Sequence, residues 1–235
     1  MASPYKNRFK NFFLSKSISR ENMKKLVADH LDALDATTQP AGAPDTAAMA
    51  ARLRPLFDKF ETGLGSGAAT QAQRQSETTT VGGAFEALKA YPAEAARKYI
   101  MPEHEEKSAV YKEFFPQGRT AFSGASQKSI GTDMRAFIAT ATKHVGTVGA
   151  TVATRAQELL TAFEQADATQ GQADKATKDG RQAIKADQRV LAVELFANYG
   201  ALLTAFAAAP EQAATYFDFS GLPSTSKSKQ KTTAA

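Results

Sequence analysis

The chain has 235 residues, 43% hydrophobic and 23% charged, which is enough for one good core or two small domains. It has no Cys, and this excludes disulfides, thiolate catalysis and Cys-ligated metals. The net charge of +5 lies at the ends, because residues 1–25 carry +6 and the last lysines +3, which leaves −4 for the middle. This distribution argues against a basic groove across the folded part.

No apolar run approaches the roughly 18–20 residues that a membrane-spanning helix needs. The N-terminus also lacks the continuous apolar stretch and the cleavage site of a secretory signal. We therefore expect a cytoplasmic protein. A cleavable N-terminal targeting segment is the alternative, because the chain is basic and has no acidic residue before Glu21, as in organellar presequences.

Residues 1–15 are predicted to form a basic amphipathic segment. Aromatic residues share one helical face and basic residues occupy the rest, namely Tyr5, Phe9, Phe12 and Phe13 against Lys6, Arg8 and Lys10. The favoured interpretation is that the aromatic rings dock on the folded part. Tyr5-Lys6 resembles Tyr111-Lys112, and both lead into a Lys-Ser-Ile sequence. Contact of these residues with a partner or an anionic surface is the alternative.

A first helix is predicted from about Ser19 to a loop that begins at Thr37. Its apolar residues recur every three or four positions, as on one helix face: Met23, Leu26, Val27, His30, Leu31 and Leu34. Asp45 or Thr46 is expected to cap a second helix. Pro55 predicts a kink or a new start in it, because proline lacks the backbone N–H, and Gly63–Gly67 is expected to close it.

A third helix is predicted over residues 69–99, with a bend or break at Thr78–Gly83, where β-branched residues and glycines lower helix propensity. Pro102 is expected to open a short fourth helix that ends at Phe114–Pro116. The second half follows the same plan. Its predicted elements are a helix on Met134, Phe137, Ile138, Ala141 and Val145, a helix on Val152, Leu159, Leu160 and Phe163, a long helix over 173–208, and a short helix from Pro210 to about Phe219.

The two halves share sequence features that indicate an internal repeat. Lys16-Ser17-Ile18 recurs as Lys128-Ser129-Ile130, and at a second offset Phe85–Tyr91 is answered by Val193–Tyr199 and Pro102-Glu103 by Pro210-Glu211. An internal repeat is considered first because it determines how many structural units the chain contains. The predicted organisation is residues 1–15 as the amphipathic segment, 16–116 and 117–223 as helical repeats, and 224–235 as a disordered polar and basic tail.

The predicted fold is therefore all-α, an antiparallel helical bundle built from two tandem repeats of three to four helices, with essentially no β-sheet. The repeats are expected to share one core, because each is short. The side chains expected inside it are Phe57, Phe60, Phe85, Phe137, Phe163, Leu195 and Phe206.

The connector between the halves reads Phe114-Phe115-Pro116-Gln117-Gly118-Arg119-Thr120-Ala121-Phe122. This FFPxGR-type turn, ahead of an amphipathic helix, resembles a group of uncharacterised all-helical two-repeat proteins of Bacteroidota. The resemblance implies a helical fold, and it carries no established activity and no site residues.

The three histidines are the main candidates for chemistry. His30 lies on the apolar face of the first helix and is interpreted as a hydrogen-bonded core residue. His104 lies in the predicted first helical turn after Pro102, where its acidic neighbours are interpreted as complementing the helix dipole, and a metal site of His104 with Glu105 or Glu106 is the minor alternative. His144 is interpreted as a boundary residue.

No catalytic motif was found, so we expect no enzyme, no cofactor and no metal. The sequence Gly63-x-Gly65-x-Gly67 lacks the strand and the Gly-Lys-Ser/Thr of a phosphate loop and is interpreted as a helix C-cap. We expect a structural or protein-interaction protein that binds protein partners or itself through helical faces. The alternative is an adaptor for nucleic acid or a membrane surface through residues 1–25, and a ligand cavity between helices is a third interpretation.

Overall fold

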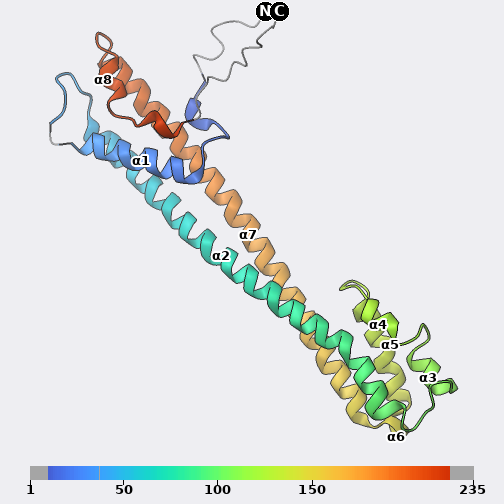
Figure 1. Cartoon of the computed structure of the whole chain (residues 1–235). Coiled ribbons are helices and arrows are strands. Elements are labelled where there is room, and N and C mark those ends of the chain that lie inside the picture. Colours follow the sequence, from blue (N-terminus) through green and yellow to red (C-terminus); the bar gives the residue numbers. More distant parts are fainter. Residues whose placement is uncertain (1–9, 37, 223–235) are drawn as a thin grey trace, which may run out of the picture. The chain divides into compact units, whose positions relative to one another are not determined.

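The computed structural model describes residues 10–36 and 38–222, and every regular element in them is helical (Figure 1). The all-α prediction is thus confirmed for these residues, which contain no strand. None of their helices is long and apolar enough to cross a membrane. The elements are η1 (Phe12–Leu14), α1 (Arg20–Asp35), α2 (Thr46–Ala95), η2 (Ala96–Ile100), α3 (Ala109–Phe114), α4 (Thr120–Gly124), α5 (Ile130–Lys143), α6 (Val145–Val148), α7 (Ala150–Ala205), α8 (Glu211–Ala214) and η3 (Phe219–Gly221).

The chain folds into two compact units, and each unit draws on helices from both halves of the sequence. Unit 1 comprises residues 1–68 and 179–235, and unit 2 comprises residues 69–178. The long helices α2 and α7 contribute to both. Each predicted repeat, 16–116 or 117–223, therefore supplies residues to both units, and the repeat organisation itself stays a prediction.

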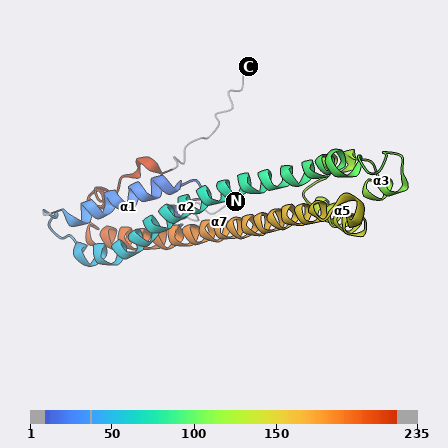
Figure 2. The same ribbon diagram turned by 90° about the horizontal axis from the view of Figure 1, so that it is seen from below.

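In unit 1, α1 lies beside the first part of α2 and the last part of α7 (Figures 1 and 2). Ser19 caps α1 as predicted, because its hydroxyl accepts a hydrogen bond from the backbone N of Asn22 at 3.0 Å. The whole predicted apolar face of α1 is buried. It forms one core with side chains of α2 and α7, among them Leu53, Phe60, Leu191, Leu195 and Leu202.

Unit 2 contains α3 to α6 together with the last part of α2 and the first part of α7. Its core is centred on Phe137 of α5, whose ring centroid lies 5.4 Å from Phe114, 5.9 Å from Phe115 and 5.8 Å from Phe122. The hydroxyl of Tyr91 on α2 donates to the carbonyl of Val152 on α7 at 3.1 Å. The aromatic residues of the connector thus pack on α5 around Phe137.

The predicted helix end at Gly63–Gly67 is wrong, because α2 runs without a break from Thr46 to Ala95. Gly63 and Gly67 face Ile184 of α7, and a β-carbon at Gly67 would lie only 2.9 Å from the Cδ1 of Ile184. Each glycine costs a helix about 1 kcal/mol. Burial of an Ile side chain stabilises by roughly 1.5–3 kcal/mol and offsets that cost.

The predicted new start at Pro55 and the predicted break at Thr78–Gly83 are also absent from α2. The hydroxyls of Thr78, Thr79 and Thr80 each donate to the carbonyl four residues earlier, at 2.9–3.2 Å, so these side chains are satisfied within the helix. Val81 beside them is buried. Packing of this apolar residue outweighs the low intrinsic propensity of the segment.

The helices predicted around Pro102 and after residue 145 differ from those observed. The π-helical turn η2 follows α2, Pro102 lies in a turn, and α3 begins later, capped by the Ser108 hydroxyl. Val145 does not extend the face of α5, because α5 ends at Lys143. The two helices predicted over 152–163 and 173–208 are one helix, α7. Pro210 does precede α8, as expected.

Six of the seven side chains that were expected in the core are buried, and Phe85 is half-buried. They divide between two cores. Phe57, Phe60, Leu195 and Phe206 belong to unit 1, whereas Phe137 and Phe163 belong to unit 2 and Phe85 packs against its edge.

Candidate functional site

The described end of the N-terminal segment lies along α7 in unit 1. The side chain of Asn11 caps η1 by accepting a hydrogen bond from Phe13 N at 3.0 Å, and its Nδ2 donates to the carbonyl of Ala192 at 2.8 Å. Further along, Nε2 of Gln188 donates to the carbonyl of Ile18 at 3.1 Å. Two side-chain hydrogen bonds therefore attach this segment to the helix.

The two described aromatic residues of the segment have different environments. Phe13 is only 1% exposed and packs at 5.7 Å from the ring of Phe217, which agrees with the docking interpretation. Phe12 is 37% exposed, with its ring edge-on to Tyr199 at 5.4 Å and to Phe196 at 6.1 Å. Of the other residues predicted to contact a partner, Lys10 is described and exposed. Tyr5, Lys6, Arg8 and Phe9 lie outside the described residues.

Both η1 and the part of α7 to which it is attached carry exposed apolar side chains. Leu14 is 43% exposed, Val190 is 47% exposed and Val193 is 53% exposed, while Phe12 adds part of its ring. We call these four residues, with the exposed cations around them, the η1–α7 face. The cations are Lys10 and Lys16 beside η1, and Lys185 and Arg189 on α7.

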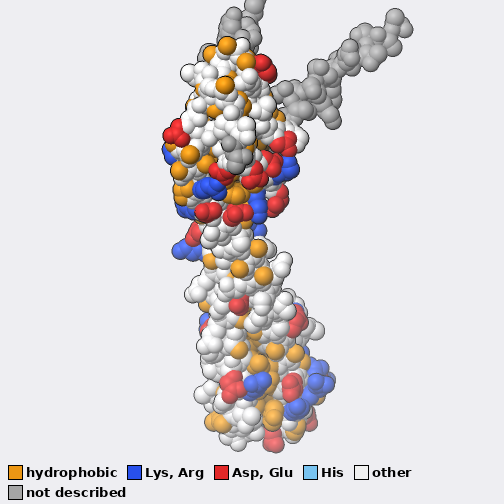
Figure 3. All heavy atoms as spheres, turned by 90° about the vertical axis from the view of Figure 1, so that its left-hand side faces the viewer, with side chains coloured by type: hydrophobic (Ala, Val, Ile, Leu, Met, Phe, Trp, Pro, Cys, Tyr) orange, Lys and Arg blue, Asp and Glu red, His pale blue; other side chains and the backbone are white. Residues whose placement is uncertain are grey.

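None of the four cations of the η1–α7 face forms an ion pair within residues 10–36 and 38–222. Elsewhere in the unit, opposite charges pair: Lys24 with Glu61, Lys25 with Asp218, and Arg54 with Asp35. On the side shown in Figure 3, cationic and anionic side chains are accordingly intermixed. The η1–α7 face therefore combines apolar area with uncompensated positive charge.

A buried polar network lies behind this face, centred on His30. Its Nδ1 donates to the carbonyl of Tyr216 at 2.8 Å, and its Nε2 accepts from Nδ2 of Asn198 at 3.2 Å. The Phe217 ring stacks on the imidazole at 4.1 Å between centroids. Desolvation lowers the pKa of His30 to about 4, although its bond to the Tyr216 carbonyl acts in the opposite direction. His30 is thus a neutral, hydrogen-bonded core residue, as predicted.

The network extends in both directions and links the segment around Tyr216 to α1 and to Gln39. The amide oxygen of Asn198 accepts from Arg52 at 3.4 Å, and Arg52 also donates to Glu194 at 2.9 Å. At the other end, the hydroxyl of Tyr216 donates to Oε1 of Gln39 at 2.6 Å. Nε2 of Gln39 in turn donates to the last carbonyls of α1. These groups all satisfy one another, so the network holds the fold together.

The other two histidines meet at one end of unit 2. Nε2 of His104 lies 3.0 Å from the Thr147 hydroxyl, Nε2 of His144 lies 2.9 Å from Glu113, and the two rings are 6.3 Å apart. The pKa of Glu113 is lowered by its bonds to Lys143 and to His144. His104 and its acidic neighbours lie between η2 and α3 and not in the first turn of a helix, so the predicted stabilisation of a helix start by these acidic residues is wrong. Among the described residues, no three His, Asp or Glu side chains could hold a metal together.

The FFPxGR-type connector is joined by an ion pair to the turn that follows η2 in unit 2. Gly118 has a positive φ of 81°, and Arg119 beyond it pairs with Glu106 at 3.3 Å, which fastens the turn that follows η2. The hydroxyl of Tyr111 is buried nearby and has no hydrogen-bond partner among the described residues. Its pKa is raised chiefly by desolvation. This connector closes the aromatic core, which explains its two adjacent phenylalanines.

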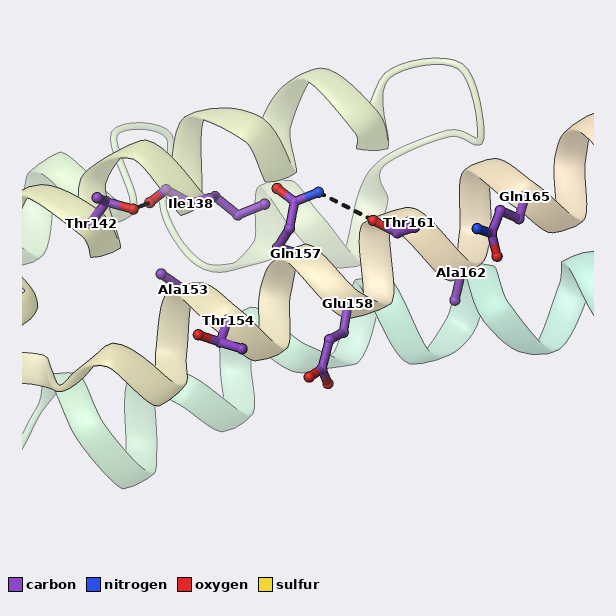
Figure 4. A pocket seen from close by; sticks show the side chains of 9 residues that line it. All are labelled: Ile138, Thr142, Ala153, Thr154, Gln157, Glu158, Thr161, Ala162 and Gln165. Atoms are coloured by element: carbon purple, nitrogen blue, oxygen red, sulfur yellow. Dashed lines mark hydrogen bonds between the residues drawn. The ribbon is translucent and has the colours of Figure 1, made fainter.

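A shallow groove of about 640 Å³ runs between α5 and α7 in unit 2 (Figure 4). Its lining is mostly short or uncharged: Ile138, Thr142, Ala153, Thr154, Gln157, Glu158, Thr161, Ala162 and Gln165. The Gln157 amide donates to the Thr161 hydroxyl at 3.2 Å on the same helix. The groove brings no charged or nucleophilic cluster together, and it is the place where the third interpretation, a ligand between helices, would apply.

Comparison with known proteins adds no assignment, since no protein family, curated protein or solved structure matches the chain. The candidate site therefore rests on geometry. Sequence reasoning found Lys10, Phe12 and Phe13 but missed the contribution of α7. The signal that was available is the pair Val190 and Val193, which lies outside the stripe of Leu191, Leu195 and Leu202.

Proposed function

We propose that the protein is a non-enzymatic helical protein that binds another protein through the η1–α7 face. The observation that carries this proposal is the exposure of Val190 and Val193, three residues apart on α7, together with that of Phe12 and Leu14 on η1, which is attached to the same helix. Apolar side chains gathered on one face are typical of interaction sites. Covering the exposed half of each side chain would stabilise a complex by roughly 1 kcal/mol per residue.

The test is capture of partners from native lysate by the full chain and by single variants, with washes at low and high salt. Val190→Asp and Val193→Asp place a charge on the face at exposed positions, so both variants should fold. Val145→Asp is the matched control, because Val145 is 45% exposed but lies in unit 2. We expect captured protein to fall at least tenfold for the face variants only. Capture of equal amounts of partner protein by all three variants would contradict the proposal.

A second candidate function is binding to an anionic surface, either nucleic acid or membrane. It is favoured by the four cations of the face, Lys10, Lys16, Lys185 and Arg189, which have no ion pair among the described residues. Binding driven by phosphate groups weakens steeply as salt rises, whereas apolar packing does not. Binding that disappears in the high-salt wash and in the variant Lys185→Glu, Arg189→Glu, but is unaffected by the uncharged change Val193→Ala, would favour this second function.

The tandem-repeat organisation is part of the proposal, supported by the similar construction of the two units. Each unit has a short helical turn with a buried phenylalanine, Phe13 in η1 or Phe122 in α4, ahead of an amphipathic helix. Each also contains an aromatic segment that follows a long helix. If the two units are copies of one module, the specificity of partner binding would come from surfaces in which they differ, such as the η1–α7 face of unit 1.

A further inference from the structure

We propose that residues 209–222, which we call the C-terminal strap, are released from unit 1 in acid when His30 takes up a proton. The strap contains α8 and η3 and lies beside α1 (Figure 1). The position of His30 between the strap and α7 carries this inference. The release does not depend on the protein-binding function proposed above.

The imidazole of His30 is the inner attachment point of the strap. His30 belongs to α1 and has no exposed surface. On one side its Nδ1 donates to the Tyr216 carbonyl at 2.8 Å, and the Phe217 ring of the strap stacks on it at 4.1 Å. On the other side its Nε2 meets the amide of Asn198 on α7 at 3.2 Å. Both ring nitrogens are therefore occupied, and water reaches the ring only if a neighbouring element moves.

The strap is the neighbour with the fewest buried contacts. Helix α1 contributes a whole apolar face to the core of unit 1, and α7 contributes several leucines. The buried side chains of the strap are Ala213, Tyr216 and Phe217, and its two helical elements have four and three residues. Short elements with few buried contacts open at a lower free energy than long packed helices do. Lifting the strap is therefore the least costly way to hydrate His30.

The other links of the strap do not respond to mild acid. Asp218 pairs with Lys25, which also bonds to Asp29 at 2.9 Å. The pKa of Asp218 is held well below its ordinary value, chiefly by its bond to Lys25, so this carboxylate stays ionised. The hydroxyl of Tyr216 donates to Gln39 at 2.6 Å, and desolvation raises its pKa, so it stays protonated. His30 is thus the link that titrates.

The remaining charges beside the imidazole are paired with each other, since Arg52 of α2 donates to Glu194 and to Asn198 of α7. The two ring nitrogens of His30 are bonded to a carbonyl and an amide, which leaves an imidazolium uncompensated. Desolvation therefore holds the pKa at about 4 while the strap is closed, against 6.5 in water. Because the released state binds the proton more tightly, lowering the pH from 7.5 to 4.5 multiplies the equilibrium constant for release by roughly 70.

The test is hydrogen–deuterium exchange of the full chain at pH 7.5 and 4.5, corrected for the intrinsic exchange rate at each pH. The reporters are the amides of Ala213 and Phe217, which donate to carbonyls within the strap. Their protection should fall at least tenfold at pH 4.5 and should lie at least tenfold below that of amides in the middle of α1 and α7. His30→Gln should abolish the fall, whereas His104→Gln, which removes a histidine of unit 2, should leave it unchanged.

A second variant changes the sign of the response. Asn198→Asp places a carboxylate against Nε2 of His30, beside Arg52, so the imidazolium is paired and the strap should stay protected at pH 4.5. If His30→Gln loses the strap at both pH values, this variant decides, and a fall as large as in the wild type would overturn the proposal. Strap protection equal to that of α1, which means release only with unfolding of the unit, would overturn it as well. So would an unchanged fall in His30→Gln.

Discussion

Lowering the pH from 7.5 to 4.5 should reduce the free energy of unfolding by about 2.5 kcal/mol through His30 alone. The folded protein holds the pKa of this imidazole at about 4, against an ordinary value of 6.5 in the unfolded chain. Between these values the unfolded chain binds a proton that the folded chain rejects. The contribution of the neutral His30 to the free energy of unfolding is therefore fully present above pH 6.5 and is lost as the pH falls toward 4.

The geometry of the network explains why the folded protein rejects the proton. The neutral ring donates from Nδ1 to the Tyr216 carbonyl and accepts at Nε2 from Asn198. A second proton on Nε2 would face the amide hydrogens of Asn198, and the Asn198 amide is oriented by Arg52, which donates to its oxygen. The charged imidazolium would also be buried against the Phe217 ring, without a carboxylate to pair with it.

Urea unfolding followed by circular dichroism at pH 7.5 and pH 4.5 measures this loss, and NMR of the imidazole gives its pKa directly. His30→Gln removes the titrating group and should reduce the difference between the two pH values by about 2.5 kcal/mol. Tyr91→Phe is the control, because it loses a hydrogen bond of a group whose pKa of about 12 lies far above this range, and it should lower the stability by the same amount at both pH values. An identical pH dependence in the wild type and in His30→Gln would refute the reasoning.

Two further predictions concern packing. Tyr111→Phe should be neutral or slightly stabilising, because the Tyr111 hydroxyl is buried without a partner among the described residues, whereas Tyr91→Phe loses a hydrogen bond to a carbonyl of α7 and should cost about 1 kcal/mol in urea unfolding. Gly65→Ala should stabilise by up to about 1 kcal/mol, since no atom lies within 4 Å of its new methyl group, and Gly67→Ala should gain clearly less because its methyl meets Ile184. A larger gain in melting temperature at position 67 than at position 65 would contradict this account.

The sequence alone determined the elements whose signals are local. Helix α1 was placed from Ser19 and from the spacing of apolar residues between Met23 and Leu34, because a side-chain cap and a three-to-four period are properties of a few consecutive turns. His30 was recognised as a core residue for the same reason. Part of the candidate site was also readable, since the aromatic and basic pattern around Phe12 and Phe13 is contiguous.

Only the tertiary structure decided how far the long helices run and what the face consists of. The glycines and threonines of α2 predict breaks by propensity, yet the helix continues, because Ile184 packs on Gly63 and Gly67 and buried apolar groups such as Val81 outweigh the local cost. Similarly, η1 lies on α7 through the bond from Asn11 to the Ala192 carbonyl, a contact between residues 181 positions apart in the chain. Local propensity is short-ranged, whereas packing energy depends on partners that sequence order does not reveal.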